Sequence, residues 1–175
     1  MEYIMRTRNI IVLPYDPAWA IAFAELQQLL CTALQDTILR IEHVGSTSVP
    51  GLWAKPILDI DIVIDSDTLL PAVIDRLTAL GYVYEGDLGI TDRHAFRYDV
   101  NPIAMEHHLY VCPAHSAELH RHITFRDYLR SNAAARNAYS DVKRQAAQRY
   151  PHDIDGYIAY KSAIITQLYQ QCGLC

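Results

Sequence analysis

The stretch from Gly45 to Ile64 reads GSTSVPGLWAKPILDIDIVI, and its second half decides the fold. Side chains alternate between the two faces of a strand, so Asp59 and Asp61 share one face with Ile57 and Val63. The opposite face is apolar throughout and consists of Leu58, Ile60, Ile62 and Ile64. A run this apolar predicts a central, largely buried strand. The sequence therefore predicts a sheet that carries a pair of carboxylates on one face.

Two neighbouring carboxylates on a buried strand need a compensating charge. Asp59 and Asp61 would repel each other, and burying them unpaired is costly. A divalent cation removes both problems, and Mg²⁺ takes a few carboxylates and completes its shell with water and phosphate oxygens. We therefore expect Asp59 and Asp61 to hold Mg²⁺ or Mn²⁺. The alternative is that both reach solvent at the strand end, or that one pairs with an arginine.

Gly45 and Ser46 form the turn that precedes this strand. A strand is expected over 38–44, and a turn with a short helix is expected over 46–54. A glycine lets the backbone approach a phosphate, the start of a helix presents free N–H groups, and a serine hydroxyl can bind a phosphate oxygen. Taken alone, the pair is typical of any strand-to-helix turn. Twelve residues separate Ser46 from Asp59, and the combination predicts a phosphate-binding turn beside the carboxylates.

The rest of the chain indicates a mixed α/β half followed by a helical half. Apolar residues at helical spacing predict one helix after Pro17 and another that Asp67 caps and Gly81 ends. Further strands are expected at 10–13, 82–85, 95–100 and 104–112, and helices at roughly 115–130, 132–149 and 153–171. We predict a single domain over 1–175, in which an α/β core at 1–112 carries a helical extension at 113–175.

Gly-Ser followed by Asp-x-Asp at this spacing resembles the nucleotidyltransferase superfamily, and residues 42–64, EHVGSTSVPGLWAKPILDIDIVI, resemble its GrpB-like family. The resemblance continues in PYDPAW at 14–19, Gly81-Tyr82, HLYV at 108–111, FRDYLR at 125–130, Tyr139-x3-Lys143 and Tyr157-x3-Lys161. It implies an α/β (α+β) fold with a nucleotidyltransferase-like mixed sheet flanked by helices. Some members replace the second aspartate, so Asp61 favours retained metal binding here. The second histidine of the family's His-Leu-His-Val is Tyr110 in this chain.

Nucleotidyltransferases usually add a third carboxylate from a nearby strand. Glu106 is the candidate here, as a metal ligand and catalytic residue beside Asp59 and Asp61, and Asp99 is a weaker one. His108 shares the face of Glu106 and is a candidate substrate contact. The alternative is a solvent-facing edge strand that bears polar residues.

Four basic residues are candidates for binding phosphate. Lys55 lies between the turn and the strand, and Arg126 and Arg130 lie four apart on one helix face, where both can reach one anion. Lys161 lies among apolar residues of the last helix and must either extend to solvent or meet an anion. For Lys55 the alternative is solvation, and Asp127 is an internal partner for any of these cations.

The net charge of −5 argues against an extended nucleic-acid surface. No apolar run approaches the ~20 residues that span a bilayer. The first residues lack a basic region followed by an apolar one, so we do not expect a secretory signal. We therefore expect a cytoplasmic protein without a membrane partner. The leading hypothesis is a Mg-dependent nucleotidyltransferase that binds a nucleoside triphosphate and transfers its nucleotidyl group to a small-molecule or protein acceptor. The alternatives are a non-catalytic nucleotide-sensing or partner-binding module and a hydrolase that uses the same aspartates.

Overall fold

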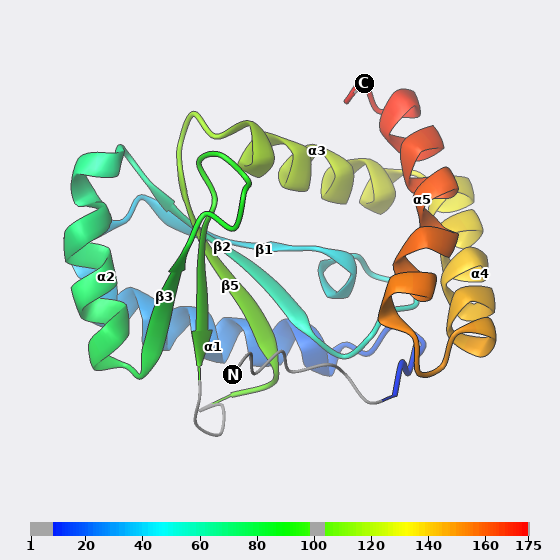
Figure 1. Cartoon of the computed structure of the whole chain (residues 1–175), viewed down its shortest axis with the longest axis horizontal. Helices are drawn as coiled ribbons and strands as arrows, with labels where there is room; N and C mark the ends of the chain where they lie inside the picture. Colours follow the sequence, from blue (N-terminus) through cyan, green and yellow to red (C-terminus); the bar gives the residue numbers. More distant parts are fainter. Residues whose placement is uncertain (1–8, 99–103, 175) are drawn as a thin grey trace.

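The computed structural model describes residues 9–98 and 104–174 and contains, in these ranges, one mixed sheet of five strands (Figure 1). The strands lie in the order β1 (Arg40–Val44), β2 (Leu58–Ile64), β5 (His107–Pro113), β4 (His94–Tyr98) and β3 (Tyr82–Gly86). Strand β2 pairs antiparallel with β1 and parallel with β5. The isoleucine-rich segment is thus an inner strand, as predicted.

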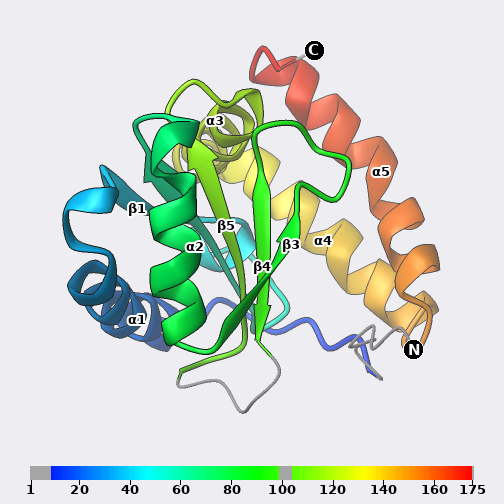
Figure 2. The same cartoon turned by 60° about the vertical axis from the view of Figure 1, so that its left-hand side comes forward.

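Helices cover both faces of the sheet (Figure 2). Helices α1 (Ala18–Leu34) and α2 (Leu70–Ala79) lie on one side, and α3 (Ala117–Ser131), α4 (Ala133–Arg149) and α5 (Ile154–Gln171) lie on the other. Short 3₁₀ turns, η1 (Gln35–Thr37), η2 (Ser46–Ser48) and η3 (Asp67–Leu69), complete the connections. None of the described helices is long and apolar enough to cross a membrane.

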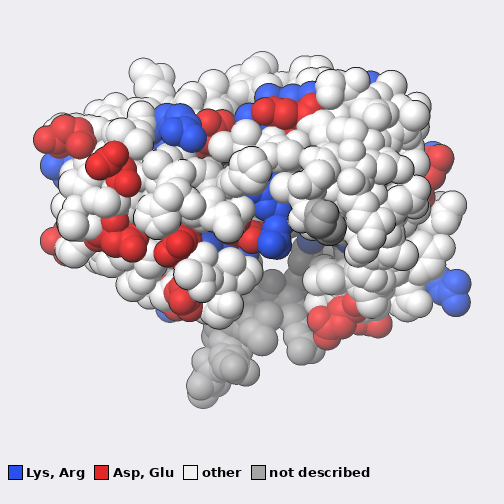
Figure 3. All heavy atoms as spheres, turned by 90° about the horizontal axis from the view of Figure 1, so that it is seen from above, with Lys and Arg blue, Asp and Glu red and all other residues white. Residues whose placement is uncertain are grey.

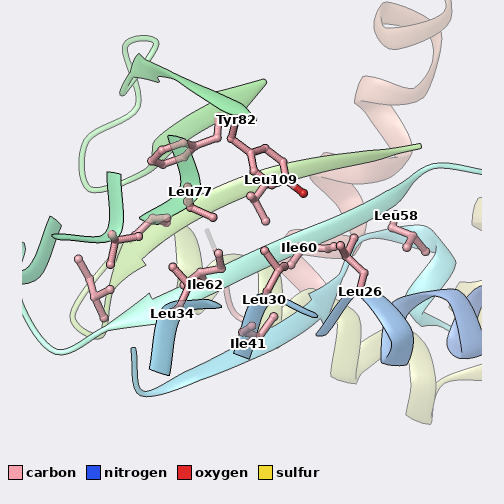
Figure 4. Close-up of a cluster of buried hydrophobic side chains, with 14 of the residues drawn as sticks. Leu26, Leu30, Leu34, Ile41, Leu58, Ile60, Ile62, Leu77, Tyr82 and Leu109 are labelled. Atoms are coloured by element: carbon pink, nitrogen blue, oxygen red, sulfur yellow. The ribbon is translucent and has the colours of Figure 1, made fainter. Parts of the chain in front are cut away.

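The two faces of β2 differ as its alternation predicts. Its apolar face packs against α1 and α2 in the main core, which includes Leu26, Leu30, Leu34, Ile41, Leu58, Ile60, Ile62, Leu77 and Leu109 (Figure 4). On the other face, Val63 and Cys112 pack against Leu119 of α3. Asp59 and Asp61 share this second face, so the sheet presents both carboxylates toward the three C-terminal helices.

Several predicted elements differ in detail from the observed ones, including the strand expected over 38–44, which begins at Arg40. The expected strand at 10–13 is a single bridge between Leu13 and Ala54, because the N–H of Ile10 donates instead to the carbonyl of Pro151. The second helix begins after η3, so Asp67 provides no side-chain cap. The strand expected at 104–112 begins at His107. The end of the strand expected at 95–100, with Asp99, lies outside the described residues.

Candidate functional site

Gly45 and Asp59 meet where β1 ends. Val44 is the β1 partner of Asp59 in the sheet, and Gly45 follows it with a φ of 69°. A Cβ atom at position 45 would lie 2.1 Å from Oδ2 of Asp59. The Asp59 carboxylate therefore occupies the space that a side chain would need, and the turn and the carboxylate strand come together as their spacing predicts.

Each aspartate of the pair receives a hydrogen bond from a histidine. Nδ1 of His108 lies 2.8 Å from Oδ1 of Asp59, and Nδ1 of His122 lies 2.6 Å from Oδ2 of Asp61. On its other side, Nε2 of His122 lies 3.2 Å from a carboxylate oxygen of Glu118. Asp61 is fully buried, and its Oδ1 has no hydrogen-bond partner within the described chain.

These pairs set the charge of the site. Burial alone would raise the pKa of Asp59, but His108 holds it below the usual value, while the hydrogen bond to Asp59 raises the pKa of His108. Burial raises the pKa of Asp61, and the bond from His122 offsets this only in part. Burial would lower the pKa of His122, but Asp61 and Glu118 together raise it. Both imidazoles thus favour the cationic form that neutralises the aspartates.

The oxygens that the two aspartates leave free are of the chemical type that a hard divalent cation prefers. Each aspartate keeps one oxygen that its histidine does not use, namely Oδ2 of Asp59 beside Gly45 and the unpartnered Oδ1 of Asp61. Two carboxylate oxygens on one strand face suit Mg²⁺, which takes its remaining ligands from water and phosphate. Residues 9–98 and 104–174 contain no group of three or more His, Cys, Asp or Glu side chains placed to hold a metal. The protein therefore offers a partial ligand set.

A cavity of about 370 Å³ opens beside Gly45, Ser46 and Asp59. Six basic residues line it: Lys55, Arg93, Arg121, Arg126, Lys143 and Lys161. Among its lining residues in the described ranges, Asp59 is the sole acidic one. Figure 3 shows one face of the molecule, on which basic side chains gather in a central hollow and several acidic ones lie toward one end. In a chain of net charge −5, such a concentration of positive charge creates a local field that attracts anions.

Two lysines of the cavity share a local arrangement. Lys143 is only 3% exposed, and its ammonium donates to the Ser46 hydroxyl and, at 3.0 Å, to the carbonyl of Trp53. It also lies over the Tyr139 ring, as Lys161 lies over the ring of Tyr157. Burial lowers the pKa of Lys143 well below its usual value and that of Lys161 to about 8. Both ammoniums are poorly solvated, so an anion would be a favourable partner.

The predicted phosphate ligands Arg126 and Arg130 have other partners. Arg126 donates to Glu42 at 2.7 Å and to the carbonyl of His43 at 3.0 Å, so it ties α3 to β1. Arg130 donates to the carbonyl of Ser48 at 2.9 and 2.8 Å and does not line the cavity. The two guanidiniums share a helix face as expected, but that face meets backbone carbonyls of β1 and η2.

Glu106 does not share the cavity of Asp59. It is exposed and precedes β5. The residues of β5 that stand opposite Asp59 and Asp61 are His108 and Tyr110. Of the predicted set, the cavity brings together Gly45, Ser46, Lys55, Asp59, His108, Arg126 and Lys161.

Sequence reasoning missed four residues of this region: Arg93, Arg121, His122 and Lys143. His122 is 61 residues from Asp61 in the chain, and Lys143 is 97 from Ser46. Tertiary packing creates both contacts, and no local pattern encodes them. One sequence signal was available for Lys143. The Tyr-x3-Lys spacing occurs at 139–143 as well as at 157–161, so it indicates Lys143 as a candidate on the same grounds as Lys161.

Comparison with known proteins assigns the family. A protein-family model described as GrpB protein matches residues 9–171. The chain belongs to the GrpB family. It is 37% identical over 162 residues to UPF0157 protein PA4798 of Pseudomonas aeruginosa, a match that covers 91% of this chain and 66% of the relative. It is 32% identical over 154 residues to UPF0157 protein YqkA of Bacillus subtilis, covering 88% of this chain and 44% of YqkA. The chain thus spans less than two thirds of each of these relatives.

Solved structures confirm the expected fold. The structure of GrpB from Enterococcus faecalis matches this GrpB-family chain with a TM-score of 0.82 and 36% identity, over 93% of this chain and 96% of that one. The MgGTP-bound Cid1 poly(U) polymerase matches with a TM-score of 0.55 and 12% identity, over 79% of this chain and 45% of that one. The second likeness shows the fold alone: a nucleotidyltransferase-like mixed sheet flanked by helices.

Proposed function

We propose that this GrpB-family protein binds a nucleoside triphosphate together with Mg²⁺ or Mn²⁺. The observation that carries the proposal is the cavity in which six basic side chains surround Gly45, Ser46 and Asp59. A polyphosphate supplies the negative charge that this cavity lacks. The fold supports the proposal, because Cid1, a structural neighbour, has been solved with a UTP analogue and with MgGTP.

Five of the basic cavity residues, together with Gly45 and Ser46, would bind the triphosphate. Lys143 and Lys161, from α4 and α5, carry poorly solvated ammoniums that a phosphate tail would stabilise. Ser46, which Lys143 already contacts, would bind a phosphate oxygen, and Gly45 leaves room for the backbone to approach it. Lys55, Arg93 and Arg121 would add positive charge, whereas Arg126 chiefly holds α3 against β1.

Asp59 and Asp61 would hold the cation through the oxygens that their histidines leave free. Bound there, the metal would neutralise phosphate charge and make the α-phosphorus more electrophilic.

The reaction that suits these parts is nucleotidyl transfer. A hydroxyl oxygen attacks the α-phosphorus, and pyrophosphate leaves with the electron pair of the broken bond. The lysines and arginines would stabilise the charge that develops on the departing pyrophosphate. The net charge of −5 favours a small-molecule or protein acceptor over a polynucleotide.

A second candidate is nucleotide binding without turnover. The observation that favours it is the identity of the β5 residues: His108 and Tyr110 stand opposite the aspartates, where a third carboxylate is expected. Neither of these two β5 residues can serve as the carboxylate that usually ligates metal or accepts a proton.

A thermal-shift screen of ATP, GTP, CTP and UTP, with and without Mg²⁺, tests the binding step. We expect a metal-dependent rise in melting temperature for wild type and for Asp65→Asn, a control at an exposed aspartate beyond β2. Asp59→Asn should abolish that rise. An Asp59→Asn variant that binds and turns over like wild type would sink the proposal. Released pyrophosphate indicates transfer, orthophosphate indicates hydrolysis, and neither product indicates a sensor.

A further inference from the structure

A second cavity, of about 390 Å³, adjoins the first. Its floor comes from β4 and β5, and its lining includes Leu88 from the β3–β4 connection and Ile158 from α5. Six residues line both cavities: Lys55, Ile57, His108, Tyr110, Ile154 and Ile158. The two spaces therefore meet at His108, the residue whose Nδ1 contacts Asp59.

The two cavities differ in charge. The first has six basic residues against Asp59, whereas the second has Glu85 and Glu106 against Lys55 and Arg97. Nε of Arg97 lies 3.2 Å from a carboxylate oxygen of Glu85, so these two charges are already matched. The second cavity thus has no surplus of positive charge for a phosphate, and the exposed carboxylate of Glu106 would repel one.

The second cavity is also partly apolar. Leu88 and Ile158 are 61% and 54% exposed, which is unusual for large aliphatic side chains that line a cavity. A carbon skeleton placed between them would bury apolar surface that water now covers. This cavity therefore suits an organic molecule with apolar groups and no net negative charge.

We propose that the second cavity is the acceptor subsite and takes a hydroxyl compound that carries no phosphate. This inference rests on the proposed function, with the nucleotide in the first cavity. His108 and Tyr110, on the shared wall, are the β5 partners of Asp59 and Asp61, so an acceptor hydroxyl at this wall lies at the carboxylate end of the nucleotide site. The acceptor oxygen bonds to the α-phosphorus, the bond to the pyrophosphate oxygen breaks, and the hydroxyl proton passes to solvent. Glu106 then selects the acceptor by charge.

The test compares three alcohols as probes: glycerol, the cationic serinol and the anionic glycerol 3-phosphate. The whole protein is incubated with Mg²⁺ and each of the four ribonucleoside triphosphates, labelled at the α-phosphate, and nucleotidyl esters are quantified. For wild type we expect transfer to glycerol and serinol and little to glycerol 3-phosphate. Glu106→Lys should raise transfer to glycerol 3-phosphate relative to serinol by about threefold to tenfold, as expected for a partly solvated charge contact.

Glu25→Lys is the matched control, because Glu25 is exposed on α1, across the sheet from both cavities, and its replacement changes the net charge equally. Both variants should keep the wild-type Kd for the Mg-nucleotide. A Kd tightened more than about tenfold in Glu106→Lys alone would place the nucleotide in the second cavity, beside position 106, and overturn the inference. If the protein binds the nucleotide but forms no ester with any probe, or uses all three probes equally, the acceptor inference is overturned while the proposed function stands. If no triphosphate binds, the proposed function itself fails.

Discussion

Replacing Gly45 with alanine tests the contact on which the site is built. The backbone at Gly45 has φ 69° and ψ −171°, a combination that is essentially restricted to glycine. The added methyl group would lie 2.1 Å from Oδ2 and 2.7 Å from Cβ and Cγ of Asp59. Because the methyl group would clash with Cβ and Cγ of Asp59 as well as with Oδ2, rotation of the Asp59 side chain alone does not relieve the clash.

The expected loss of stability has two parts. An unfavourable backbone conformation costs about 1–3 kcal/mol, and forcing an extra carbon into a packed site costs about 1–3 kcal/mol more. Gly45→Ala should therefore lower the free energy of unfolding by about 2–6 kcal/mol, a large share of a domain's usual ~5–15 kcal/mol.

Urea unfolding followed by circular dichroism measures this loss, with Gly89→Ala as the control. Gly89 also has a positive φ, 80°, but an added Cβ atom there meets nothing within 4 Å. The control should show the cost of a side chain at positive φ without a clash, so a larger loss in Gly45→Ala is expected from the contact with Asp59. Equal losses in the two variants would refute the reasoning.

Two further predictions concern partly buried cations. Arg126→Met should cost about 2 kcal/mol of unfolding free energy, since it removes the donor to Oε2 of Glu42 and to the carbonyl of His43. Arg40→Met removes the exposed donor to the other oxygen of Glu42 and should cost under about 1 kcal/mol. Equal costs would contradict the role of Arg126 in holding α3 against β1. Burial lowers the pKa of Lys161 from 10.5 to about 8. At a pH between these two pKa values, the unfolded chain binds more protons than the folded one, so the stability of wild type increases as pH rises. Lys161→Met should therefore be more stable than wild type near neutral pH. The difference between the urea midpoints of the variant and wild type should be smaller at about pH 9.5 than at about pH 7. A difference that does not change with pH would contradict the lowered pKa of Lys161.

The sequence predicted the parts of the fold that have a regular period. The two-residue alternation of β2 identified which face carries Asp59 and Asp61, and the structure confirms that the other face forms the core. The three C-terminal helices also lie where apolar spacing and Pro151 placed them.

Orientation between elements was not predictable in the same way. Helical spacing put Arg126 and Arg130 on one face, but only the docking of α3 decides that this face meets β1 and η2. Alternation likewise linked Glu106 with His108, yet the strand begins at His107 and the cavity beside Asp59 ends short of Glu106. His122 and Lys143 had no local signal, because their partners lie on distant elements.

The division of charge between the two halves of the chain has a consequence for binding. The sheet supplies both aspartates, whereas α3, α4 and α5 supply four of the six cavity cations: Arg121, Arg126, Lys143 and Lys161. A metal held by the sheet and a phosphate tail held by the helices would therefore join the two halves through one ligand. Binding of this kind stabilises the folded state in proportion to the logarithm of ligand concentration. Because burial disfavours the charged forms of Lys143 and Lys161, much of that stabilisation would come from pairing these two lysines with the phosphate charges.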